Sequence, residues 1–159
     1  TREGVEDLPV PEFDELGYNY RMSDVQAAIM RVQVERLPDL MAARGAAAGW
    51  YAELLSDVEG ITLPVALDDR VHPWQSYVIT FDPDVDRGAV ALELRRRGVG
   101  CNFGTYASHV QPLYGQTEPC PVSADLFRRH LAIPMHANLT QDDVTYVAQT
   151  LRDVLTSVS

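Results

Sequence analysis

The sequence predicts a small α/β domain, α+β-like in character, in which a small sheet is flanked by long helices. The chain has 159 residues, of which 46% are hydrophobic, and this is enough for one core. Stretches with helical periodicity alternate with short stretches rich in β-branched and aromatic residues. The strand-like stretches are too few to cover the apolar helix faces. We therefore expect three strands or slightly more, and a partner domain or subunit over part of the helices.

Two long helices are predicted after a loop-like lead-in over residues 1–22. Ser23 and Gln26 have the spacing of a capping box, and apolar residues follow them at helical spacing. Pro38 should stop or kink this first helix, or begin the next one. The second helix is expected over residues 39–55.

The rest of the chain is predicted to alternate strands with helices. Residues 76–81 have strand composition, and Asp86 and Gly98 are suited to cap the two ends of the helix that follows. Residues 104–120 are expected to form a loop, because they are rich in glycine, proline and aromatic residues. The strands are expected at 76–81, 99–103 and 131–133, and the helices at 87–97, 121–129 and from 141 onwards.

Charge and composition exclude several classes of function. The net charge of −10 opposes a general affinity for nucleic acid or anionic membranes. No apolar run approaches the ~18 residues of a membrane span. Two cysteines, Cys101 and Cys120, make no disulfide framework, so a reducing cytoplasm is expected. The histidines and cysteines have no metal-ligand spacing, so no metal site is expected.

All 13 basic residues are arginines, and the chain contains no lysine. A Schiff base between a protein and a carbonyl compound requires a lysine amine. This chain cannot provide that group.

A candidate anion site precedes the first helix. Tyr18, Asn19, Tyr20 and Arg21 lie just before the capped helix N-terminus, where free amides and the helix dipole favour an anion. The guanidinium of Arg21 has a geometry suited to phosphate oxygens. The alternative is a simple helix entry in which Arg21 pairs with Asp24, and the residues alone leave both open.

Six stretches of the chain carry a common resemblance and lie, in order, at residues 17–28, 33–44, 74–77, 97–100, 106–114 and 131–140. The first reads G-Y-N-Y-R-M-S-D-V-Q-A-A, and the fifth reads Y-A-S-H-V-Q-P-L-Y. Together they resemble the motifs of the DegT/DnrJ/StrS family of sugar aminotransferases, which use pyridoxal phosphate (PLP) and have the signature G-x-N-x-R-M-(S/T)-(D/E)-x-Q-A-A and a Y-x-x-H-x-Q-P-x-Y loop.

This resemblance implies the C-terminal small domain of a fold-type-I PLP-dependent transferase. In such an enzyme Asn19 would reach the PLP phosphate of the partner subunit, with Arg21 beside the same phosphate or the substrate. Tyr18, Tyr106 and His109 would contact the nucleotide-sugar. None of these residues is expected to be catalytic in its own right.

The resemblance also implies a division of the chain and a set of partners. Residues 1–22 would belong with a large PLP-bearing domain, residues 23–56 would be linking helices, and residues 57–159 would form the small domain. The active site would be completed across a homodimer interface. We therefore expect that further residues precede Thr1 and that this chain is inactive alone.

Two other functions remain open from the sequence. Some relatives on the same scaffold replace the PLP lysine by histidine and dehydrate sugars, and the residue that decides this lies outside the present sequence. The chain could also be a non-catalytic module that binds a nucleotide-sugar or another subunit.

Overall fold

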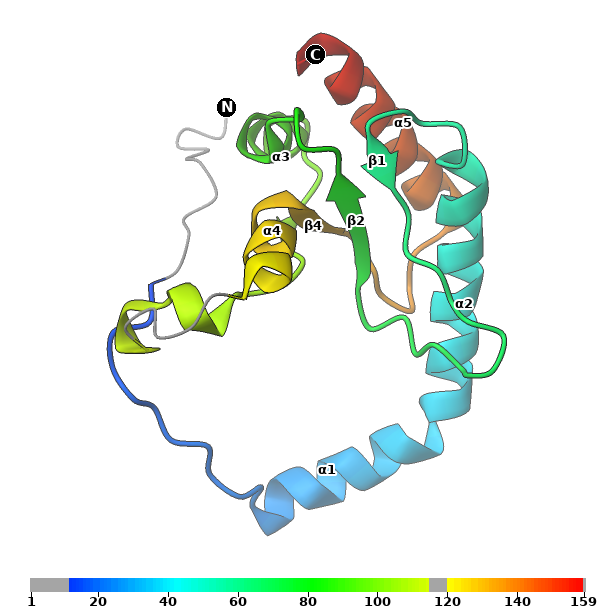
Figure 1. Cartoon of the computed structure of the whole chain (residues 1–159). Coiled ribbons are helices and arrows are strands. Elements are labelled where there is room, and N and C mark those ends of the chain that lie inside the picture. Colours follow the sequence, from blue (N-terminus) through cyan, green and yellow to red (C-terminus); the bar gives the residue numbers. More distant parts are fainter. Residues whose placement is uncertain (1–11, 115–119, 159) are drawn as a thin grey trace.

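The computed structural model describes residues 12–114 and 120–158, and Figure 1 shows how they are arranged. It has the predicted fold class, with helices around a small antiparallel sheet. The elements are α1 (Asp24–Glu35), α2 (Leu37–Leu54), β1 (Ile61–Thr62), β2 (Tyr77–Phe81), α3 (Arg87–Arg96), β3 (Asn102–Phe103), the 3-10 helices η1 (Ser108–Val110) and η2 (Pro112–Tyr114), α4 (Pro121–Arg129), β4 (His130–Ile133) and α5 (Gln141–Val158).

The sheet has four strands in the order β1-β2-β4-β3, and every neighbouring pair is antiparallel. The central pair aligns Tyr77 with Ile133 and Ile79 with Leu131. The strand β1, which is only two residues long, was not predicted from the sequence. The strand β3 is shorter than the predicted strand at 99–103, because the Val99 amide donates to the Leu94 carbonyl of α3, at 2.9 Å.

One face of the sheet carries the core. Tyr77, Ile79 and Leu131 are buried there, and α2 and α5 pack against each other and α3 against α5. Tyr51 of α2 reaches across this core, and its hydroxyl donates a 2.9 Å hydrogen bond to the Pro134 carbonyl. The second half of α2 is therefore part of the same core as the strands.

The caps expected from the sequence are present. Ser23 and Gln26 form a reciprocal capping box at α1, and the Asp86 side chain accepts from the third amide of α3. Gly98 ends α3 with a positive φ of 82°, which glycine adopts without steric cost. Thr140 begins α5 by exchanging hydrogen bonds with residue 143.

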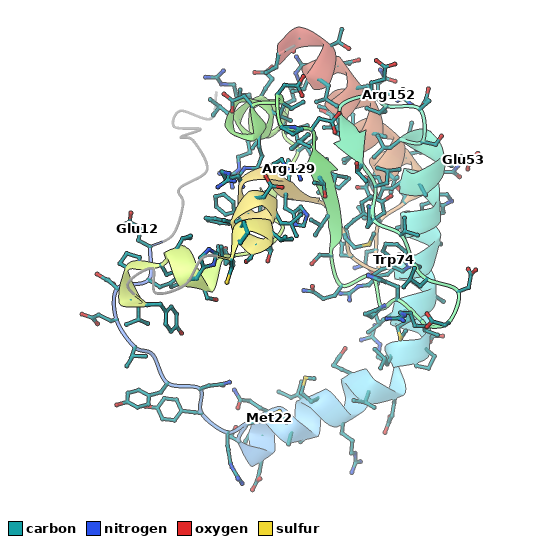
Figure 2. The ribbon with its side chains drawn as sticks, in the orientation of Figure 1. Glu12, Met22, Glu53, Trp74, Arg129 and Arg152 are labelled. Carbon is teal, nitrogen blue, oxygen red and sulfur yellow. The ribbon has the colours of Figure 1, made fainter. Side chains whose placement is uncertain are left out.

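The lead-in and α1 lie outside the core. Helix α1 has no buried residue, and Figure 1 shows it bending away from α2 at their junction. Pro38 lies in the first turn of α2, so it begins that helix, one of the outcomes predicted for it. In Figure 2 the segment between Glu12 and Met22 runs apart from the sheet, from the turns η1 and η2 to the start of α1.

Candidate functional site

The polar residues before α1 are open to solvent. Asn19 and Arg21 are exposed, and the rings of Tyr18 and Tyr20 lie 5.8 Å apart, centroid to centroid, on the same segment. Arg21 makes no salt bridge among the described residues, so the alternative pairing with Asp24 is not formed. The amide and the guanidinium are both available to a ligand.

The N-terminus of α1 adds two backbone donors. A helix leaves its first four amides without partners inside the helix. In the capping box, the Ser23 amide donates to the side-chain oxygen of Gln26 at 2.9 Å, and the Gln26 amide donates to the hydroxyl oxygen of Ser23 at 3.4 Å. This leaves the amides of Asp24 and Val25. Asn19 and Arg21 precede these amides by a few residues in the chain, and backbone amides, a side-chain amide and a guanidinium are the kinds of donor that suit a phosphate.

Tyr106 is held at the surface by other aromatic rings. Its centroid lies 6.0 Å from that of Phe103 and 6.1 Å from that of Phe127 on α4. The next residue, Ala107, is fully buried. Such ring contacts restrict the side chain, so the hydroxyl of Tyr106 is presented from a fixed place.

His109 follows on the single turn η1, where its side chain is half-buried. The turn η1 lies close to the sheet because Gly104, which precedes it in the chain, packs directly against β2 and β4. A Cβ atom added to Gly104 would come within 2.7 Å of the Cβ of His130. Only glycine fits at this approach without a shift.

Among the described residues of the lead-in, Phe13 is attached to this loop. The Phe13 amide donates a 3.1 Å hydrogen bond to the side-chain oxygen of Gln111, and the Leu113 amide donates to the Phe13 carbonyl at 3.1 Å. The Phe13 ring meets that of Tyr106 edge-on, with centroids 5.9 Å apart. The sequence did not predict this attachment.

A pocket of about 320 Å³ lies between the lead-in and the loop. The structure therefore brings Tyr106 against the lead-in, beside the turn that carries His109. Tyr18, Asn19 and Arg21 do not line the pocket and lie further along the lead-in, toward α1. The lining residues are Phe13, Glu15, Leu16, Gly17, Tyr106, Ser108, Gln111, Leu113 and Tyr114.

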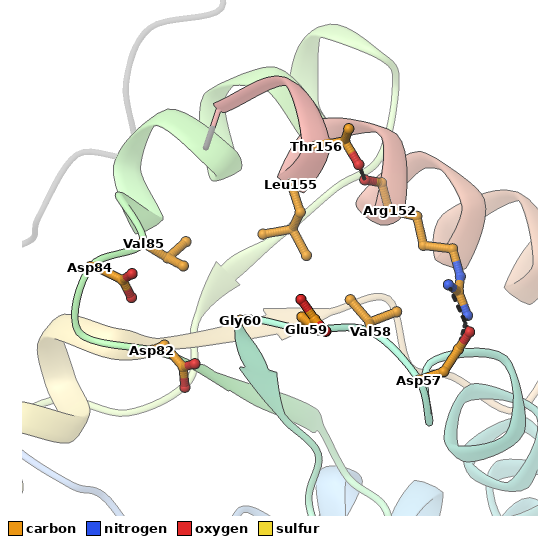
Figure 3. A pocket seen from close by; sticks show the side chains of 10 residues that line it. All are labelled: Asp57, Val58, Glu59, Gly60, Asp82, Asp84, Val85, Arg152, Leu155 and Thr156. Atoms are coloured by element: carbon orange, nitrogen blue, oxygen red, sulfur yellow. Dashed lines mark hydrogen bonds and ion pairs between the residues drawn. The ribbon is translucent and has the colours of Figure 1, made fainter.

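A second pocket, of about 780 Å³, lies near the C-terminal half of α5 and has the wrong charge for a phosphate (Figure 3). Arg152 is its single cation, and its guanidinium bonds Asp57 and the Leu54 carbonyl. That contact holds the pKa of the Asp57 carboxyl below its usual range. Three further carboxylates, those of Glu59, Asp82 and Asp84, line it, and their charge repels anions.

Among the described residues, no three His, Cys, Asp or Glu side chains are grouped to hold a metal ion. In the same residues no helix is long and apolar enough to cross a membrane.

Comparison with known proteins identifies the family of the chain. The DegT/DnrJ/EryC1/StrS aminotransferase family model matches residues 4–152. The chain is 29% identical to the spore coat polysaccharide biosynthesis protein SpsC of Bacillus subtilis (strain 168), over 91% of this chain and 39% of that protein. It is 32% identical to the dTDP-4-dehydro-2,3,6-trideoxy-D-glucose 4-aminotransferase of Saccharopolyspora spinosa, over 85% of this chain and 35% of that protein.

A solved structure is similar over the same part. The aminotransferase TlmJ of Streptoalloteichus hindustanus matches with a TM-score of 0.79 and 30% identity, over 86% of this chain and 37% of that protein. The present chain thus spans between a third and two fifths of the length of these relatives.

Proposed function

Because the chain belongs to the DegT/DnrJ/EryC1/StrS aminotransferase family, we propose that it is part of an enzyme that transfers an amino group to a nucleotide-linked keto sugar. The observation that carries the proposal is the free donor set before α1, on the same segment that is attached to the loop of Tyr106. A phosphate-binding segment and a second polar loop are what a cofactor and a nucleotide-sugar need together.

In this proposal Asn19 and Arg21 bind the phosphate of PLP. The Asn19 amide donates one hydrogen bond, and Arg21 donates two and neutralises charge. The bound cofactor supplies the chemistry of the reaction, since it accepts an amino group from a donor and passes it to the sugar. The chain itself contributes donors that are exposed and so accessible to the phosphate.

The loop of Tyr106 and His109 is proposed to bind the nucleotide-sugar, with Tyr18 on the facing segment. The Tyr106 hydroxyl can donate to or accept from a sugar hydroxyl. The imidazole of His109 can do the same, and when protonated it can bind a diphosphate oxygen. The dTDP-linked sugar in the name of the S. spinosa relative supports a nucleotide diphosphate in this position.

We further propose that the chain acts only with a lysine supplied from outside it. The 159 residues contain no lysine, while the relatives are more than twice as long. A large domain would supply the lysine and cover the apolar side of α1. A homodimer would then place Asn19 at the cofactor of the partner subunit, and residues 23–56 would link the two domains.

Amino transfer tests the proposal directly. The complete polypeptide that contains this chain is incubated with PLP, glutamate and a dTDP-linked 4-keto sugar, and the amino sugar is measured by mass spectrometry. Arg21→Ala should lower the rate at limiting PLP, whereas Arg70→Ala, which removes an exposed arginine paired with its neighbour Asp69, should not. Sugar dehydration in place of amino transfer would contradict the proposal.

A further inference from the structure

Gln111 is a buried polar residue with a specific partner. Only 5% of its surface is exposed, and its side-chain oxygen accepts the Phe13 amide from a segment 98 positions away in the sequence. A buried acceptor without a partner would cost free energy, so this oxygen favours the bound position of Phe13. The residue is part of the loop motif, but no role for it could be predicted from the sequence.

The backbone around Gln111 is itself fixed. Its amide donates to the Ser108 carbonyl at 3.1 Å, and its carbonyl accepts from the Tyr114 amide at 3.0 Å. These bonds join η1 to η2. The side chain therefore projects from a rigid double turn, and the place it offers to Phe13 is determined by the same loop that carries His109.

In the described part of the lead-in, Phe13 provides the attachment to the loop that carries Tyr106 and His109. Its two backbone hydrogen bonds run in opposite directions, one accepted by Gln111 and one donated by Leu113. From there the chain passes through exposed residues to Asn19, six positions later, and to Arg21. Loss of the attachment would free the Phe13 end of the segment that carries Asn19 and Arg21, while its other end would still be joined to α1.

We propose that Gln111 is a positioning residue that holds the segment carrying Asn19 and Arg21 in place relative to the loop carrying Tyr106 and His109. The attachment follows from the contacts alone, and the effect on the cofactor rests on the proposed function. Gln111 does not touch the reacting atoms. It determines how far apart the two ligand-binding segments are.

The attachment is tested by hydrogen exchange at the Phe13 amide of the full 159-residue chain. Gln111→Leu removes the acceptor at similar size, and exchange should become about 2–10-fold faster, as expected for one lost hydrogen bond. Gln111→Glu keeps an acceptor at the same length and should restore slow exchange. Gln149→Leu is the matched control, because Gln149 bonds only an exposed neighbour on α5. Unchanged exchange in Gln111→Leu would overturn the proposal.

Folding is checked in the same experiment. The core amide of Leu151 on α5 should exchange at the same rate in every variant. If Gln111→Leu does not fold, Gln111→Asn takes its place, since it withdraws the acceptor by one methylene and stays polar. Fast exchange at Phe13 with slow exchange at Leu151 supports the proposal, and equal acceleration at both overturns it.

Positioning is tested by PLP retention in the complete polypeptide. Gln111→Leu should weaken PLP binding by about 2–10-fold, and Gln111→Glu should not. In an Asn19→Ala background Gln111→Leu should add little, because the group it positions is gone. Equal effects in both backgrounds would show a general structural loss and overturn the positioning role. If Asn19→Ala alone leaves PLP binding unchanged, the assignment of Asn19 and the positioning role both fail, while the exchange result still decides the attachment.

Discussion

Gly104 lies against Val78 of β2 so closely that a Cβ atom on Gly104 would be 2.3 Å from the Val78 Cγ1 atom. This contact brings the loop of Tyr106 down onto the sheet. It fixes the height of the loop above β2, and with it the place of the aromatic rings that hold Tyr106.

We expect Gly104→Ala to destabilise the chain by roughly 1–3 kcal/mol, the usual cost of overpacking. Urea unfolding followed by tryptophan fluorescence measures the change. Gly49→Ala is the matched control, because nothing lies within 4 Å of a Cβ atom there. That control should stabilise α2 by about 1 kcal/mol, and similar losses in both variants would contradict the contact.

His130 should make stability depend on pH. Burial, together with the charge of Arg129, lowers the pKa of its imidazole from the ordinary value of 6.5, against the opposing effect of Asp125. The unfolded chain therefore takes up the proton at a higher pH than the folded chain does. Stability contributed by neutral His130 is present above pH 6.5 and is lost as the pH falls toward the folded pKa.

Urea unfolding between pH 7.5 and 5.5 checks this sign. The wild-type chain should lose more stability over this range than His130→Gln. A slope unchanged in His130→Gln would show that another group causes the dependence.

Many of the elements could be predicted because their signals are local. Capping residues, proline positions and apolar spacing determine α1, α2, α3 and α5 within a few neighbouring residues. The strand β1 could not be predicted, since two residues carry no periodicity and Ile61 is a strand only through its pairing with Phe81. The start of β3 could not be predicted either, because the amide of Val99, in the stretch expected to be a strand, bonds the Leu94 carbonyl of α3.

The absence of lysine predicts that this chain forms no covalent bond to PLP through an internal side chain. The chain is mixed with PLP, reduced with borohydride and digested, and the peptides are examined by mass spectrometry. Only the N-terminal amine can carry a pyridoxyl group. A modified internal residue would disprove the prediction.

The apolar face of α1 should cause association. Val25, Ile29 and Val32 recur at helical spacing and are 73%, 59% and 50% exposed, and such surfaces usually mark interfaces. We expect sedimentation at tens of micromolar to show a species larger than one chain. Ile29→Glu should weaken its association by about 10–100-fold, the loss of one buried aliphatic side chain.

An exposed valine outside α1 provides the control for this experiment. Val65 lies in the loop before β2 and is 78% exposed, so Val65→Glu should leave the association unchanged. A single chain in solution that binds no hydrophobic dye would refute the interface.

Asn19→Ala should weaken PLP retention in the complete homodimer by about 10–100-fold, since the lost bond is charge-assisted. The partner-subunit assignment is decided by a mixed dimer. One subunit carries Asn19→Ala and keeps the PLP lysine, and the other keeps Asn19 and lacks the lysine. Retention close to wild type would agree with a site that crosses the interface, and loss would place Asn19 at its own subunit's cofactor.

The candidate site was partly predictable for a different reason. Asn19 and Arg21 could be proposed from the sequence because they precede a helix start that the capping box marks, and their role as phosphate ligands stays a prediction. The attachment of Phe13 to Gln111 was not, because the two residues are 98 positions apart and neither has a local signal for the other. The ring contacts of Tyr106 were hidden in the same way.

The 12-residue α1 places a strict condition on insertions and deletions. Each added residue would turn Asn19 by about 100° around the helix axis and move it about 1.5 Å along it. A single insertion would therefore aim the amide at a different neighbour, while a seven-residue insertion would return nearly the same direction but at a distance of about 10 Å. Neither preserves both the direction and the distance, so relatives that share the proposed phosphate site should keep α1 at one length while its solvent-facing sequence varies freely.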